Sequence, residues 1–86
     1  MRKKIIAGNW KMNGSLAALA ELDGIAEAAT AHPHVDVAIC PPATLIAQMA
    51  DAAKGSPLMV GGQDCHPKPQ GAHTGDLSAA MLRDAG

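Results

Sequence analysis

Residues 4–14, KIIAGNWKMNG, determine how the whole chain is interpreted. The first six residues of this stretch favour a strand, because its two isoleucines are β-branched and its apolar residues cover both faces, as in a buried parallel strand. Residues 10–14 predict a loop that ends in the turn-forming pair Asn13-Gly14. The chain therefore starts with a strand whose carboxyl end leads into a polar loop.

The same alternation of strand and helix continues to the end of the chain. Residues 35–39 and 57–61 predict two further strands, and residues 62–76 predict a long loop rich in Gly and Pro. Ser15 and Ser78 are expected to cap the first and third helices. The second helix is expected over residues 43–53, ahead of a glycine at its end. The apolar stripes are expected at Leu16, Leu19, Leu22, Ile25, Ala26 and Ala29, at Leu45, Ile46 and Met49, and at Met81, Leu82 and Ala85.

The order β-α-β-α-β-α predicts an α/β fold of right-handed parallel βαβ units. The pattern by itself does not separate a barrel from a doubly wound sheet. No G-x-G-x-x-G and no P-loop follows the first strand, which argues against nucleotide binding. With 86 residues, the chain is long enough for one small domain.

Composition excludes several kinds of partner. The net charge of −1 gives no electrostatic basis for binding nucleic acid or an anionic membrane. No apolar run approaches the roughly 20 residues of a membrane helix, and no secretory h-region follows the basic N-terminus. The two cysteines lack CxxC spacing, so we expect free thiols and a cytoplasmic protein. No metal is expected, because the four histidines fit no Cys/His motif.

Asn9 and Lys11 are the candidate binding residues. They follow the first strand at its carboxyl end, where parallel α/β folds bind their ligands. An amide donor beside a lysine ammonium suits an anionic, oxygen-rich ligand such as a sugar phosphate. Taken alone, an N-x-K triplet is more often a strand end followed by a solvated lysine.

Three motifs in the correct order strengthen that interpretation. The first is IAGNWKMN at residues 6–13, and the second is the Cys40-Pro41-Pro42 run after the second strand. The third is GAHTGDLS at residues 71–78, leading to MLRDAG at the end. Over all 86 residues, in register, the chain closely resembles the N-terminal portion of triosephosphate isomerases. The resemblance implies the first three βα units of a TIM (β/α)8 barrel, with residues 1–86 as the N-terminal part of one truncated domain.

The resemblance also implies a reaction. Triosephosphate isomerases interconvert dihydroxyacetone phosphate and glyceraldehyde 3-phosphate in glycolysis and gluconeogenesis, without cofactor or metal. Carried over by position, Asn9 and Lys11 are the family's active-site asparagine and lysine, both catalytic and substrate-binding. The family is itself a much-studied example of a glutamate base paired with a neutral histidine electrophile. Neither the glutamate nor the histidine of the family has a matching position in this chain. Glu21 and Glu27 are expected on a helix face and cannot act as the base. The fragment alone is therefore predicted to be inactive.

The resemblance further implies a homodimer, since the family's third loop enters a pocket near the partner's active site. Thr74 matches the residue at the tip of that loop, with Gly75 beside it, and Gln63 and Cys65 are expected at its start in the dimer interface. Asp76 stands where the family usually has a glutamate, which weakens the case for an intersubunit ion pair.

Two alternatives remain at this point. One is a non-catalytic βα module that only packs or oligomerises, with Asn9, Lys11 and Thr74 as relics. The other is a different sugar-phosphate barrel enzyme that shares the lysine after the first strand. The Asn-Trp-Lys context and the third loop speak against the second of these.

Overall fold

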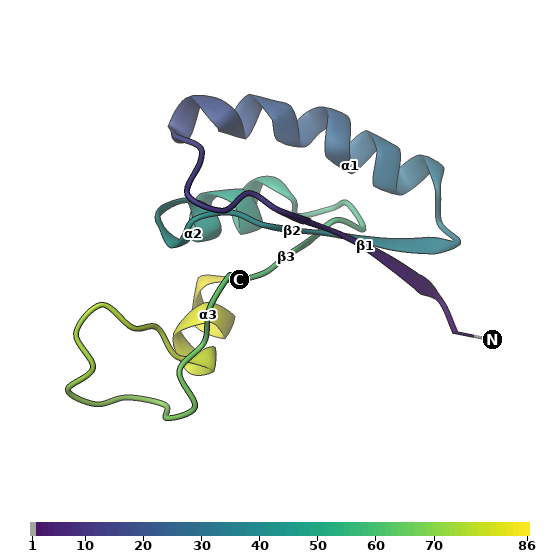
Figure 1. Cartoon of the computed structure of the whole chain (residues 1–86). Helices are drawn as coiled ribbons and strands as arrows, with labels where there is room; N and C mark the ends of the chain where they lie inside the picture. The colour runs from purple at the N-terminus through teal and green to yellow at the C-terminus, as the bar shows by residue number, and fades with distance from the viewer. Residues whose placement is uncertain (1) are drawn as a thin grey trace.

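The computed structural model describes residues 2–86 as a parallel three-stranded sheet with helices packed beside it (Figure 1). In chain order the elements are β1 (Lys4–Asn9), the 3-10 helix η1 (Leu16–Glu21), α1 (Leu22–Ala31), β2 (Val35–Cys40), α2 (Ala43–Ala52), β3 (Met59–Val60) and α3 (Ala79–Ala85). The strands lie in the order β1-β2-β3, each parallel to its neighbour. This arrangement confirms the predicted succession of three βα units.

The parallel register of the strands brings the three loops that follow them to the same end of the sheet, at the carboxyl ends of the strands. Asn9 pairs with Cys40, and Ile39 pairs with Val60. Because all three strands run in the same direction, the loops that follow them leave from the same end. The loop after β1 therefore lies beside the starts of the loops after β2 and β3, which is what positions the candidate site.

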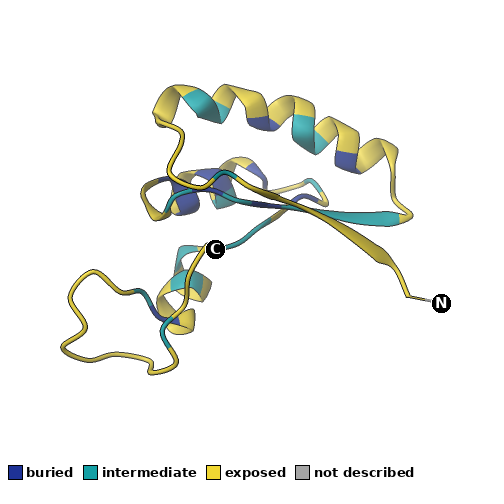
Figure 2. Ribbon diagram, viewed as in Figure 1, coloured by how far each residue is buried: buried dark blue, intermediate teal, exposed yellow. Residues whose placement is uncertain are grey.

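A small apolar core lies between the helices and β2. It consists of Leu22, Ala29, Ile39, Leu45, Met49, Ala53 and Leu58, with Trp10, Leu19, Ile25, Ala26, Val37 and Val60 packed against it. Figure 2 shows the buried positions on the sides of α1 and α2 that face the sheet. The predicted apolar stripes of these two helices are confirmed, apart from Leu16, which is 60% exposed. In the described residues no helix has the length and apolar character needed to cross a membrane.

The strands differ from the prediction in burial and in length. β1 is exposed along its whole length, with Ile5 and Ile6 about 60% exposed, although its composition predicted burial on both faces. The reason is that β1 packs mainly against β2 at the edge of the sheet, and the helices form the core against β2 rather than over the faces of β1. β3 covers only Met59 and Val60 rather than residues 57–61, because the backbone pairs with β2 only at Ala38 and Ile39.

Helix starts were only partly predicted. Ser15 makes no side-chain capping hydrogen bond; it precedes the 3-10 helix η1 rather than an α-helix, and its carbonyl accepts from the Ala18 N–H at 2.9 Å. Ser78 does cap α3, with Oγ accepting from the Met81 N–H at 3.2 Å. Met81 is 50% exposed rather than facing inward, whereas Leu82 and Ala85 are partly buried as predicted.

Gly14 and Gly24 give a matched pair of glycine substitutions. Gly14 has φ +111°, and a Cβ there would lie 3.1 Å from the Trp10 ring, so Gly14→Ala should lower the free energy of unfolding by about 1–3 kcal/mol. Gly24 lies in α1, where an added Cβ would meet nothing within 4 Å, so Gly24→Ala should raise it by about 0.5–1 kcal/mol. Urea unfolding of both variants measures the difference. Equal effects would contradict the special backbone assigned to Gly14.

Candidate functional site

The loop after β1 holds Asn9 and Lys11 in a defined geometry. The Asn9 Oδ1 atom accepts a hydrogen bond from the Lys11 backbone N–H at 2.8 Å. Lys11 itself has φ +56°, and it is the one non-glycine residue with positive φ among residues 2–86. A left-handed backbone costs a non-glycine residue about 1–2 kcal/mol. Backbone strain of this kind concentrates at functional sites, which makes Lys11 a stronger candidate than its type and position alone did.

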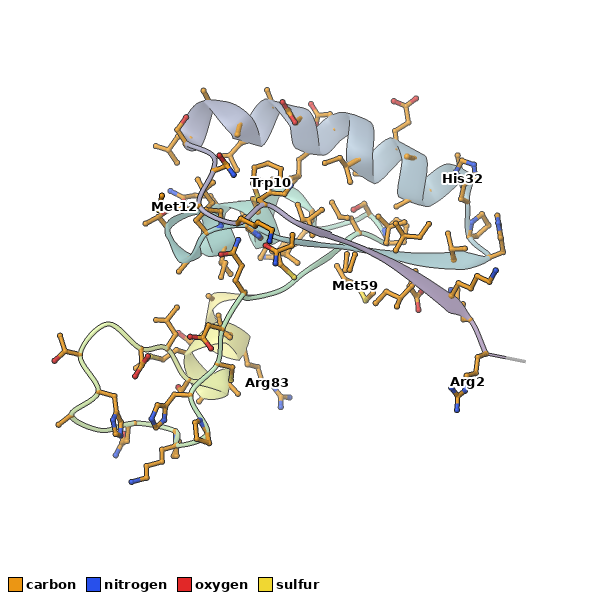
Figure 3. The ribbon with its side chains drawn as sticks, in the orientation of Figure 1. Arg2, Trp10, Met12, His32, Met59 and Arg83 are labelled. Carbon is orange, nitrogen blue, oxygen red and sulfur yellow. The ribbon has the colours of Figure 1, made fainter. Side chains whose placement is uncertain are left out.

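Trp10 anchors this loop to the rest of the fold. Its side chain is partly buried against the core, and Figure 3 shows the ring between the loop and the helices. Its backbone N–H donates to the Cys40 carbonyl at 3.1 Å, and its carbonyl accepts from the Asn13 Nδ2 atom at 2.9 Å. Trp10 is thus the packing residue that the sequence predicted, and it leaves its neighbours Asn9 and Lys11 at the surface.

The polar ends of Asn9 and Lys11 remain open to a ligand. Because the Asn9 Oδ1 atom already accepts the Lys11 N–H, the Nδ2 group is the end that can donate to a ligand oxygen. Within residues 2–86 the ion pairs are Lys3 with Asp36 and Lys54 with Asp51, so the exposed Lys11 ammonium faces no carboxylate there. The structure therefore presents one amide donor and one unpaired cation in the same exposed loop, a combination that suits a phosphorylated ligand.

Residues that could transfer a proton are not gathered around Asn9 and Lys11 at the carboxyl ends of the strands. Glu21 is exposed in η1 and Glu27 is exposed in α1, both in the helical layer, as the sequence predicted. His32 ends α1, where its Nδ1 atom lies 2.9 Å from the Ala28 carbonyl. Glu21 lines a hollow with Trp10, Asn13 and Gly14, but among the described residues no glutamate or histidine makes a hydrogen bond or ion pair with Asn9 or Lys11.

The long loop between β3 and α3 extends away from the sheet (Figure 1). Thr74, Gly75 and Cys65 are exposed in it, and the Cys65 thiol is free. Gly75 and Gln63 both line a hollow of about 170 Å³ beside Ala43 at the start of α2. The loop is thus exposed from residue 67 to residue 76, and Gly75 returns close to Gln63 at its start.

Two histidines in the same loop come together with an acid. The rings of His66 and His73 stack with centroids 3.9 Å apart and planes 26° apart, and Asp76 lies close enough for the three ligand atoms to fall within 4.8 Å of one another. Imidazole lone pairs lie in the ring plane, so stacked rings direct them side by side rather than at a shared ion. The Nδ1 atom of His66 also accepts from the Lys68 N–H at 3.0 Å. In this arrangement the two rings lie face to face, and one ring nitrogen of His66 is already hydrogen-bonded.

Gln63 is the residue whose contacts the sequence did not predict. Its side-chain amide lies against the loop after β1, within its own chain, and its predicted place in a dimer interface stays a prediction. The contact joins positions 52 residues apart, so no local pattern could have indicated it. Only the parallel alignment of β1, β2 and β3 brings the two segments together.

Comparison with known proteins identifies the family. The sequence profile described as "Triosephosphate isomerase" matches residues 4–86. The chain belongs to the triosephosphate isomerase family. Two relatives called triosephosphate isomerase, from Dinoroseobacter shibae and Jannaschia sp., are 62% and 60% identical over 86 residues. Those residues are 100% of this chain but 34% of each relative, so the chain spans about a third of the length of these curated relatives.

A solved triosephosphate isomerase places the fold. The crystal structure of the Bartonella henselae protein superposes with a TM-score of 0.87 at 45% identity, over 99% of this chain and 35% of that one. The three βα units described above thus match the N-terminal βα units of a TIM barrel. The resemblance inferred from the three sequence motifs is confirmed at the level of family and fold.

Proposed function

We propose that this chain supplies the first three βα units of a triosephosphate isomerase, an enzyme that interconverts dihydroxyacetone phosphate and glyceraldehyde 3-phosphate in glycolysis and gluconeogenesis. The observation that carries the proposal is the Asn9–Lys11 loop, where a free ammonium and a free amide donor stand on a strained backbone at the carboxyl end of β1. Ligands of TIM barrels bind at this end of the strands. Because the chain belongs to the triosephosphate isomerase family, we take a triose phosphate as the ligand of this loop.

Each of the two residues has a role that follows from its chemistry. The Lys11 ammonium neutralises the substrate phosphate and the negative charge that develops on the substrate oxygens during enolisation. The Asn9 Nδ2 group donates to a substrate oxygen, while its Oδ1 atom holds the Lys11 N–H. The groups that move the proton come from the part of the barrel that the relatives have and that residues 1–86 do not match. The proposed reaction requires no metal and no cofactor.

We further propose that the whole enzyme is a cytoplasmic homodimer. The support is the long loop after β3, in which Gln63, Cys65, Thr74 and Gly75 are all exposed. In a dimer this loop inserts beside the partner's active site, and Thr74 approaches the partner's Asn9 and Lys11. Within its own subunit, Gln63 donates a hydrogen bond to the Lys11 carbonyl in the loop after β1.

The test is to complete the barrel. Residues 1–86 are joined to the C-terminal part of the Dinoroseobacter shibae relative, in place of its own 62% identical segment; this chimera is called the completed enzyme below. We expect isomerase activity within about tenfold of that relative, and a molar mass by light scattering of twice that of one chain. A folded but inactive completed enzyme would favour the non-catalytic module, and an active monomer would overturn the dimer alone.

A further inference from the structure

The side chain of Gln63 ties together the loops that follow the three strands. Its Nε2 atom donates to the Lys11 carbonyl oxygen at 2.9 Å and to the Cys40 carbonyl oxygen at 2.9 Å. The amide group has two N–H donors, so each carbonyl receives one of them. The opposite amide orientation would set the Oε1 atom against two carbonyl oxygens. The two contacts therefore fix both the position and the orientation of this amide.

The Cys40 carbonyl is a shared anchor. It accepts from Gln63 Nε2 and also from the Trp10 N–H at 3.1 Å, so the end of β2 holds the loop after β1 and the segment after β3 at once. The Gly61 N–H donates to the Ile39 carbonyl at 2.9 Å and continues the pairing of β2 with β3 up to this point. Gln63 thus follows closely after Gly61, whose backbone is held by its hydrogen bond to β2.

The contact with Lys11 matters because both of its backbone polar groups are then held. The Lys11 N–H is bound by Asn9 Oδ1 at 2.8 Å, and the Lys11 carbonyl is bound by Gln63 Nε2. Hydrogen bonds to both the N–H and the carbonyl of one residue restrain its φ and ψ, and with them the direction of its Cα–Cβ bond. Lys11 needs such support, since its φ of +56° costs about 1–2 kcal/mol relative to relaxed backbone.

We propose that Gln63 is a positioning residue for Lys11: by holding the Lys11 carbonyl it keeps the backbone in the left-handed conformation that aims the ammonium at the substrate. This inference rests on the proposed function, since it takes Lys11 as the residue that binds substrate. It assigns to Gln63 an action within one subunit, separate from any contact that the loop makes with a partner. Displacing a reacting or charge-bearing group by about 1 Å can cost about 100-fold in rate.

The first test is Gln63→Met in the completed enzyme, a substitution that keeps length and removes both donors. We expect kcat/KM to fall about 10- to 100-fold. Gln48→Met is the matched control, because Gln48 is exposed on α2 and away from the strand ends, and it should change kcat/KM by less than about twofold. A wild-type kcat/KM in Gln63→Met, in an active completed enzyme, would overturn the inference and leave the proposed function standing.

The second test asks whether Gln63 acts through Lys11. The Gln63→Met substitution is repeated in a Lys11→Ala background, where the ammonium to be positioned is absent. A positioning role predicts less than about a twofold further loss there, whereas independent effects would multiply. A full second loss would overturn the inference. An inactive wild-type completed enzyme would instead overturn the proposed function, so the two failures are distinguishable.

Gln63→Glu covers the case in which Gln63→Met does not fold. It preserves the size and polarity of the side chain, but its carboxylate faces the two carbonyl oxygens and should cost at least as much in kcat/KM. Circular dichroism and the unfolding midpoint are measured for both variants beside Gln48→Met. If both variants fail to fold, Gln63 stabilises the carboxyl ends of the strands as a whole rather than positioning Lys11, and the inference is wrong.

Discussion

Residues 1–86 alone should interconvert the two triose phosphates no faster than buffer, whereas the completed enzyme should be active. Enzymes accelerate their reactions by about a million-fold or more, and general acid–base groups are part of that effect. The described residues place Lys11 and Asn9 at the strand ends but leave Glu21 and Glu27 in the helical layer. A bound substrate would thus meet a charge and a hydrogen-bond donor, but no base.

The assay needs a host strain without its own isomerase, so that contamination does not supply the rate. The purified chain is measured alone and after mixing with a separately produced C-terminal part of the Dinoroseobacter shibae relative. Recovery of activity on mixing would show that the missing groups are all that the chain lacks. Turnover by residues 1–86 alone, at a rate comparable with the intact relative, would show that this division of roles is wrong.

Lys11→Ala in the completed enzyme should lower kcat/KM by about 100- to 1,000-fold. The expected size follows from the proposed role, in which the Lys11 ammonium stabilises negative charge that develops on the substrate. The proposed role also gives the ammonium a contact with the ground-state phosphate, so the loss should appear in KM as well as in kcat. Steady-state kinetics in both directions of the reaction measure the two parameters.

Lys54→Ala is the matched control for the loss of a lysine. The Lys54 ammonium lies 3.3 Å from Asp51 on the surface, with both side chains 79% exposed, so an effect of less than about twofold on kcat/KM is expected. If Lys11→Ala resembled Lys54→Ala, Lys11 would be an ordinary solvated lysine and the proposed role would fail. Unfolding midpoints of both variants separate loss of activity from loss of fold.

The elements of this fold were largely predictable because their signals are local. The apolar stripe of α2, at Leu45, Ile46 and Met49, is buried as the helical spacing predicted, and the Ser78 cap forms as its position indicated. The predictions were wrong where burial or strand length depends on elements that are distant in the sequence. The exposure of β1 depends on which elements cover its faces, and the length of β3 depends on how many of its residues pair with β2.

At the candidate site, the sequence determined the chemical groups and the family. Asn9, Lys11 and Trp10 follow the first strand in a family motif, and that fixed the amide, the cation and the end of the sheet at which they stand. Only the tertiary structure decided the left-handed backbone of Lys11 and its support by Gln63. The physical reason is that a hydrogen bond between positions 52 residues apart depends on the register of three parallel strands, which no stretch of sequence encodes by itself.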